Sequence, residues 1–349
     1  MRTGRPQTVV WFCMLATALA LSGCFSGASK TAAPKPDWLS AETTKQSSRV
    51  VIEKVTYKSG DLIIFGQVCR PAGVGPHPVI IMNHGGFGGV PDWDAPKGFC
   101  AVAAKAGWAV AESSYRGEDG SGGRIEVCLG EVDDVLAMLD VVRAQSYADP
   151  KRIAMIGLSH GGCITTKAVE RGADIDLAVD IAGPKDWNSL MPALKRSAMS
   201  ESTSPVLRRM HQTVVDAVEK AVGGTSEQYP ERYAKRSPDA EKIAQWDKPF
   251  LILHGTADAI VPVQQSCAFA DKIGDVKAYR LDASGDVASQ PPPGCEALTW
   301  NGPPTPVGTF DADRYLLAYD GIDHFLVANN GRRRLTSDFL DFLEAKLPG

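Results

Sequence analysis

The sequence predicts an α/β fold, in which a mostly parallel sheet is covered by helices on both faces. Short, continuously apolar runs at residues 78–82, 177–182 and 250–253 are typical of strands buried on both faces. Helical segments lie between such runs, as at 131–142, where apolar residues recur at i, i+3, i+4 and i+7. Regular alternation of the two patterns favours a parallel sheet. With 349 residues and 44% hydrophobic content, the chain can form one large domain.

The first residues indicate a targeting segment. Arg2 and Arg5 precede an apolar run at 9–21, which is too short to span a bilayer. Leu21-Ser22-Gly23-Cys24 resembles the lipobox of bacterial lipoproteins. The resemblance implies that 1–23 is a signal peptide and that a lipid on Cys24 anchors an exported protein to the cell envelope. The alternative is an ordinary secretory leader that leaves Cys24 as a plain thiol.

The tether and the domain are distinguished by composition. Residues 24–48 are rich in Ser, Ala, Thr, Lys and Pro, so we expect the lipidated cysteine and a flexible tether there. The domain then occupies 49–349. The net charge of −4 gives no attraction for nucleic acid.

The first half of the domain reads as strands and helices in turn. A glycine-rich loop at 83–89 follows the first buried strand, and Asp133 and Asp134 are interpreted as charges that favour the start of a helix. The expected elements are a hairpin at 49–57 and 62–69, strands at 78–82 and 108–113, and helices at 99–106 and 131–142.

A serine at the apex of a sharp turn comes next. The apolar run 153–156 leads into Gly157-Leu158-Ser159-His160-Gly161, and a helical segment follows. A strand, a sharp turn and a helix in this order hold a serine hydroxyl clear of the sheet, and glycines are needed because a Cβ there would collide with backbone. The alternative is a glycine-rich loop without chemistry.

The second half interrupts the alternation and then restores it. Residues 187–246 are predicted to be a helical insertion that caps the site, and 282–313, rich in Pro and Gly, a long rim loop. The remaining expected elements are strands at 177–182, 250–253, 277–281 and 315–319, and helices at 264–273 and 336–347.

Three polar residues follow three of these strands, in the order Ser159, Asp258, His324. Serine needs a base to take its proton, and a carboxylate must fix the tautomer of that base. This chain order is that of the α/β-hydrolase fold. Two backbone N–H groups would hold the oxyanion: that of His160 and, from the glycine loop, that of Gly86, with Phe87 as the alternative. Only the backbone of His160, and not its ring, is assigned a role.

Several motifs resemble the catalytic domain of the prolyl oligopeptidase family and its dienelactone-hydrolase-like relatives. The resemblance covers residues 50–347 and implies a serine-type peptidase or esterase. Full-length family peptidases carry a β-propeller before this domain, and only the tether and hairpin stand there in this chain. Position 160 is often Tyr in the family and is His here. The matching motifs are 115–117, 149–153, 157–162, 229–233, 237–238, 254–258, 261–262 and 324–325.

The sequence therefore predicts an exported, membrane-tethered serine hydrolase that acts on small esters or short peptides through an acyl-enzyme. Ester and peptide substrates are not separated by these residues. The rival hypothesis is a lipoprotein that uses the fold only to bind a ligand or partner. No metal or cofactor is expected, and the oligomeric state is open.

Beyond Cys24 the chain has six cysteines, which suit disulfides in an oxidising compartment. The preferred pair is Cys267 with Cys295, because Cys295 lies in a loop with little else to fix it. Cys163 is expected to be a buried apolar residue or a disulfide partner. The pairing of Cys69, Cys100, Cys128 and Cys163 is left open.

Overall fold

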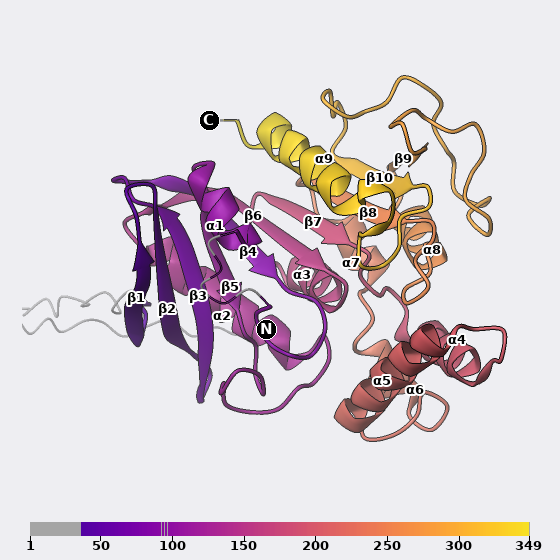
Figure 1. Ribbon diagram of the computed structural model, residues 1–349, viewed down its shortest axis with the longest axis horizontal. Helices are drawn as coiled ribbons and strands as arrows, with labels where there is room; N and C mark the ends of the chain where they lie inside the picture. Colours follow the sequence, from indigo (N-terminus) through magenta and orange to yellow (C-terminus); the bar gives the residue numbers. More distant parts are fainter. Residues whose placement is uncertain (1–35, 92, 94, 96, 349) are drawn as a thin grey trace, which may run out of the picture. The chain divides into compact units, whose positions relative to one another are not determined.

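A computed structural model describes residues 36–348 except 92, 94 and 96. The predicted signal peptide and Cys24 lie outside the described residues. The described chain forms one ten-stranded sheet in the order β1-β2-β3-β5-β4-β6-β7-β8-β10-β9 (Figure 1).

The strands are β1 (Ser40–Gln46), β2 (Val50–Ser59), β3 (Leu62–Pro71), β4 (His77–Asn83), β5 (Ala109–Ser113), β6 (Ala148–Leu158), β7 (Leu177–Ile181), β8 (Phe250–Gly255), β9 (Lys277–Leu281) and β10 (Arg314–Tyr319). The helices are α1 (Phe99–Lys105), α2 (Gly130–Ala144), α3 (His160–Glu170), α4 (Trp187–Met199), α5 (Pro205–Val222), α6 (Pro230–Ala234), α7 (Ala240–Ala244), α8 (Gln264–Ile273) and α9 (Gly331–Lys346). A short 3-10 turn, Ala328–Asn330, precedes α9.

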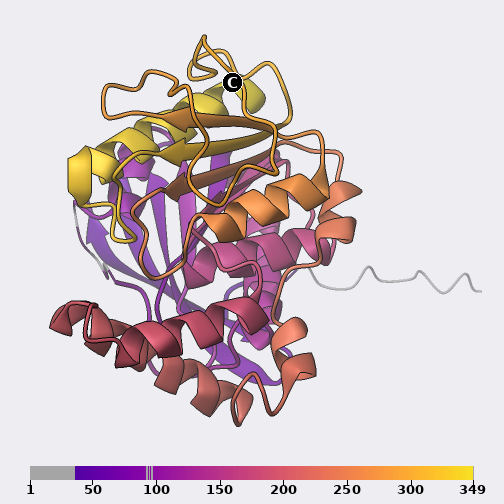
Figure 2. The same ribbon diagram turned by 90° about the vertical axis from the view of Figure 1, so that its right-hand side faces the viewer.

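The sheet is parallel from β5 to β9 and antiparallel at its other edge, where β1, β2, β3 and β5 pair in succession. Alternate side chains of the buried strands enter two separate apolar cores: Val79 and Ile81 of β4 face one, and Ile80 faces the other. Helices α2, α3 and α8 cover the first core, whereas α1 and α9 cover the second (Figures 1 and 2). The predicted α/β fold with helices on both faces is confirmed.

Two predicted boundaries are wrong. Residues 40–46, assigned to the flexible tether, form the edge strand β1, because their backbone pairs with β2 although their side chains are mostly exposed. The last helix begins at Gly331 and not at Thr336, since the three arginines 332–334 are good helix formers and extend it. None of the helices that the structure describes is long and apolar enough to cross a membrane.

The insertion at 187–246 is helical as predicted and consists of α4 to α7. Helices α4, α5 and α6 lie on the side toward which the arrowheads of β4 and β7 point (Figure 1). Three disulfides join the six cysteines: Cys267–Cys295, as preferred from the sequence, Cys69–Cys100 and Cys128–Cys163. The first fixes the rim loop to α8, and the last joins α3 to the loop before α2.

Candidate active site

The turn between β6 and α3 forces Ser159 into a conformation that L residues rarely adopt, with φ 55° and ψ −119°. A Cβ on Gly157 would lie 2.0 Å from the carbonyl oxygen of Gly161, and one on Gly161 would lie 2.0 Å from that of Asn83. Both glycines are therefore required by close backbone contacts, as the sequence predicted. The turn projects Ser159 beyond the carboxyl end of β6.

The structure brings the three predicted residues together from three strand ends. Nε2 of His324, which follows β10, lies 2.8 Å from Oγ of Ser159, and Nδ1 of the same ring lies 2.7 Å from Oδ2 of Asp258, which follows β8. The carboxylate can only accept at Nδ1, so the proton of the neutral ring is on Nδ1 and Nε2 accepts the hydroxyl proton of Ser159. This is the tautomer that a general base requires.

Asp258 is 6% exposed and fully hydrogen-bonded. Its Oδ1 accepts the N–H groups of Ile260 and Val261 at 2.9 and 2.8 Å. Burial alone raises the pKa of this carboxyl, but hydrogen bonds from His254 and His324 outweigh burial and hold the pKa well below its ordinary range. Asp258 is therefore charged at neutral pH, as an orienting acid must be.

His254, near the end of β8, supports that carboxylate. Its Nε2 donates to the carbonyl of Val261 at 2.7 Å and lies 3.4 Å from Oδ2 of Asp258. Its Nδ1 lies 2.7 Å from the hydroxyl oxygen of Ser266.

The glycine loop after β4 lies against the serine turn. A Cβ on Gly85 would be 2.9 Å from the carbonyl of Leu158 and 3.1 Å from Cβ of Ser159. Gly86 has φ +76°, and a Cβ there would meet no atom within 4 Å, so this residue faces open space beside the turn. Gly85 and the first residue of α3, His160, therefore adjoin Ser159, and the oxyanion roles expected for the N–H groups of Gly86 and His160 stay a prediction.

Two acidic side chains hold the far end of the glycine loop, and sequence reasoning did not find them. Oε2 of Glu118 accepts the N–H of Gly89, and Oδ2 of Asp119 accepts that of Val90, both at 2.9 Å. Burial raises the pKa of Glu118 to about 8. The only sequence signal was their place in a polar loop after β5.

His84, at the start of the loop, is also buried. Its Nδ1 donates to the carbonyl of Gly85 at 3.1 Å, and its Nε2 lies 3.4 Å from Oε2 of Glu118. Its ring stacks on Tyr115 with centroids 4.2 Å apart. Burial lowers the pKa of His84 to about 4, so the ring is neutral at pH 7. His84 therefore helps to fix the start of the glycine loop.

The interpretation of Asp134 as a helix-start charge is wrong. Its carboxylate is 0% exposed and forms a two-pronged ion pair with Arg116, at 3.0 Å to Nε and 2.8 Å to Nη2. Asp133 lies in the first turn of α2 as expected. Helix periodicity alone could not show that position 134 faces the loop at 115–117.

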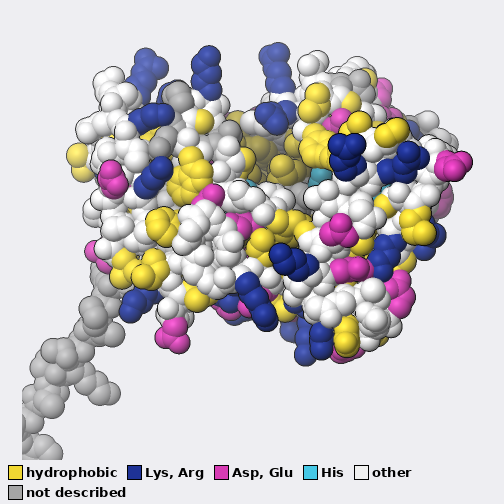
Figure 3. All heavy atoms as spheres, turned by 60° about the horizontal axis from the view of Figure 1, so that its bottom comes forward, with side chains coloured by type: hydrophobic (Ala, Val, Ile, Leu, Met, Phe, Trp, Pro, Cys, Tyr) yellow, Lys and Arg dark blue, Asp and Glu magenta, His cyan; other side chains and the backbone are white. Residues whose placement is uncertain are grey.

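Seen from one side, the surface has a hollow in which apolar and histidine side chains are visible between two raised parts (Figure 3). Among the described residues, no group of three or more His, Cys, Asp or Glu side chains could hold a metal ion.

Comparison with known proteins identifies the family. Residues 99–281, more than half of the chain, match the sequence profile of the prolyl oligopeptidase family. The chain belongs to this family. It is therefore a hydrolase, and the sheet order and helices described above are those of the α/β-hydrolase fold shared by its structural neighbours.

Three similar proteins align with this chain over different fractions of their own length. The uncharacterized peptidase YtmA of Bacillus subtilis is 24% identical over 65% of this chain and 81% of its own. The acylaminoacyl peptidase of Pyrococcus horikoshii aligns with a TM-score of 0.58 at 20% identity, over 86% of this chain but 42% of its own. Acetyl xylan esterase 1 of Thermoanaerobacterium sp. aligns with a TM-score of 0.56 at 13% identity, over 87% of both chains.

Proposed function

We propose that this prolyl oligopeptidase family member is a serine hydrolase that cleaves small esters or short peptides through an acyl-enzyme. The observation that carries the proposal is the continuous hydrogen-bonded chain Ser159–His324–Asp258. In the proposed mechanism Ser159 attacks the substrate carbonyl while His324 takes its proton. Asp258 orients the ring and stabilises the imidazolium, and His324 then protonates the leaving group.

The tetrahedral intermediate places a negative charge on the former carbonyl oxygen. We propose that the backbone N–H groups of His160 and Gly86 hold this oxyanion, because His160 follows Ser159 in the chain, Gly86 follows the residue that packs on Ser159, and neither needs its side chain for the contact. Water would then attack the acyl-enzyme, with His324 again as the base, and release the acid.

Small esters are the preferred substrate class in this proposal. An acetyl xylan esterase shares the fold over 87% of both chains, which supports an ester substrate, and the peptidase YtmA, aligned over 81% of its own length, supports a short peptide as the second candidate. The deciding experiment compares p-nitrophenyl esters of graded acyl length with N-acylated amino-acid amides and Xaa-Pro amides. Amide turnover as fast as ester turnover would contradict the ester preference.

We also propose that the protein is exported and held to the cell envelope by a lipid on Cys24. The lipobox-like motif and the three disulfides, which persist in oxidising compartments, support this. The Cys24→Ala variant should move from the membrane fraction to the soluble fraction. Unchanged fractionation would remove the anchor from the proposal.

A further inference from the structure

The imidazole of His160 links two segments that the sequence did not connect. Its Nδ1 lies 3.1 Å from the carbonyl oxygen of Gly86, in the glycine loop, and its Nε2 lies 3.2 Å from the backbone nitrogen of Cys128, in the loop before α2. The side chain is 3% exposed, and its ring also packs against Phe87 with centroids 4.8 Å apart. Both ring nitrogens are thus occupied by backbone groups.

These two partners fix the tautomer of the ring. A backbone N–H can only donate and a carbonyl can only accept, so Nε2 of His160 carries the lone pair and Nδ1 carries the proton. Burial lowers the pKa of His160 to about 4, which keeps the ring neutral at pH 7. A second proton would have to go on Nε2, where it would face the N–H of Cys128.

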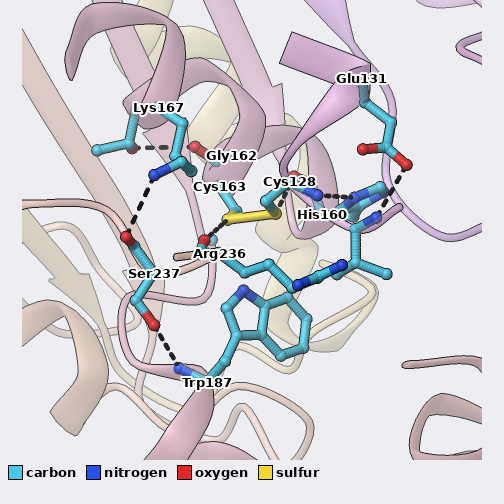
Figure 4. The surroundings of a disulfide bond; sticks show 12 residues. Cys128, Glu131, His160, Gly162, Cys163, Lys167, Trp187, Arg236 and Ser237 are labelled. Atoms are coloured by element: carbon cyan, nitrogen blue, oxygen red, sulfur yellow. Dashed lines mark hydrogen bonds between the residues drawn. A yellow bond between two sulfur atoms is a disulfide. The ribbon is translucent and has the colours of Figure 1, made fainter. Parts of the chain in front are cut away.

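The position of Cys128 is fixed by hydrogen bonds to its neighbours in the chain and by a disulfide. Oε1 of Glu131 accepts the N–H groups of Glu126 and Val127, and Oε2 accepts that of Leu129. The N–H of Cys128, between them, is the one that points to His160 (Figure 4). Its side chain is joined to Cys163, one turn along the same helix that His160 begins. The ring is therefore held by a rigid frame.

The contact with the carbonyl of Gly86 fixes the peptide unit between Gly86 and Phe87, because a peptide unit is planar and holding its carbonyl also sets its N–H, here that of Phe87. His84 holds the carbonyl of Gly85, which belongs to the peptide unit that carries the N–H of Gly86. His160 holds the next carbonyl, that of Gly86 itself. Gly86 has φ +76°, and the two peptide planes that adjoin it are both held by buried rings.

We infer that the imidazole of His160 is a positioning residue: in its Nδ1–H tautomer, set by the N–H of Cys128, it holds the carbonyl of Gly86 and so keeps the glycine loop aimed at the oxyanion. This role rests on the proposed serine hydrolase function. It differs from the role of the His160 backbone, which lends an N–H directly to the oxyanion and is present whatever the side chain.

The kinetic test uses two substitutions at this position. His160→Leu removes both ring contacts, whereas His160→Asn keeps a donor, Nδ2, at the place of Nδ1. We expect the leucine variant to lower kcat on p-nitrophenyl acetate about 100-fold with KM changed less than about threefold, since misplaced oxyanion donors cost transition-state binding. Asparagine should recover activity to within about tenfold of the unmodified protein. His77→Leu, at the opposite end of β4, is the matched control.

A trifluoromethyl ketone inhibitor distinguishes misplaced oxyanion donors from general misfolding of the variant. It forms a tetrahedral adduct with an oxyanion, so its inhibition constant should rise in the leucine variant by the same factor as kcat/KM falls. A leucine variant within threefold of the normal kcat, or an asparagine variant no better than leucine, would overturn the inference.

The second measurement does not depend on activity or on the leucine variant being folded. ¹⁵N spectra of the imidazole groups in the Ser159→Ala protein at pH 7 should show the His160 proton on Nδ1. A proton on Nε2 would overturn the inference. If the unmodified protein neither hydrolyses esters nor reacts with a serine probe, the proposed function fails. The spectrum still reports whether the His160 clamp exists, that is, the pair of hydrogen bonds from its ring to the backbone of Cys128 and Gly86.

Discussion

Replacing Asp258 by Asn should abolish most of the activity without unfolding the protein, and the hydrogen bonds around the carboxylate show why. Oδ1 accepts two backbone N–H groups, from Ile260 and Val261, so an Asn must keep its carbonyl oxygen there. Its NH2 group then faces Nδ1 of His324, which now lies 2.7 Å from Oδ2. Because an amide NH2 donates, Nδ1 must become the acceptor, and the ring proton moves to Nε2.

A proton on Nε2 of His324 points at Ser159, so the ring can no longer take the hydroxyl proton. Loss of the correct tautomer in a serine–histidine–aspartate site lowers kcat about 10⁴-fold, and at about 1.36 kcal/mol per factor of ten this is about 5.5 kcal/mol of activation free energy. The assay is kcat on p-nitrophenyl acetate, with circular dichroism as the folding check. Asp61→Asn, in the exposed turn between β2 and β3, is the control for an Asp-to-Asn change outside the site. A folded Asp258→Asn protein that keeps more than a tenth of the normal kcat would refute the assignment.

Three further predictions concern the scaffold. Gly157→Ala should destabilise the fold by about 3 kcal/mol or more, because its Cβ would lie 2.0 Å from backbone, whereas Gly73→Ala, with no atom within 4 Å, should change the urea midpoint little. His84 and His160 have folded pKa values of about 4 against 6.5 unfolded, so the unfolded state binds more protons in that window. Unfolding free energy should therefore fall as pH drops from 6.5 toward 4, by up to about 3 kcal/mol for each histidine, and the fall measured in urea should be smaller for His160→Asn. Replacing both Cys267 and Cys295 by serine removes a disulfide that spans 28 residues and should lower the unfolding free energy by about 3 kcal/mol. Limited proteolysis of this variant should cut first at 282–313. Cleavage elsewhere at the same rate would contradict the role of the disulfide in fixing the rim loop.

The sequence predicted the fold and the meeting of Ser159, Asp258 and His324 because each depends on a local signal. The glycines at 157 and 161 report a turn too tight for a Cβ, and apolar runs report strands buried on both faces. Since the carboxyl ends of parallel strands share one edge of a sheet, residues after β6, β8 and β10 must come together. Chain order then identified the roles expected of them.

The features that the sequence missed depend on contacts between distant segments. Edge strand β1 is polar and exposed, and only its pairing with β2 makes it a strand. Asp134 pairs with Arg116, 18 positions away. The ring of His160 bonds to Cys128 and Gly86, which lie 32 and 74 positions away. No periodicity in the sequence indicates such contacts. Glu118 and Asp119 likewise gain their role only when their loop reaches the glycine loop.

The most direct measurement of the central claim is labelling of residues 25–349 by a fluorophosphonate, which reacts with a serine only when a neighbouring base activates it. We expect one label on the peptide that contains Ser159, its complete loss in Ser159→Ala, and a rate at least 100-fold lower in His324→Gln. Labelling of the folded Ser159→Ala protein at the normal rate, or no labelling of the unmodified protein, would contradict the account.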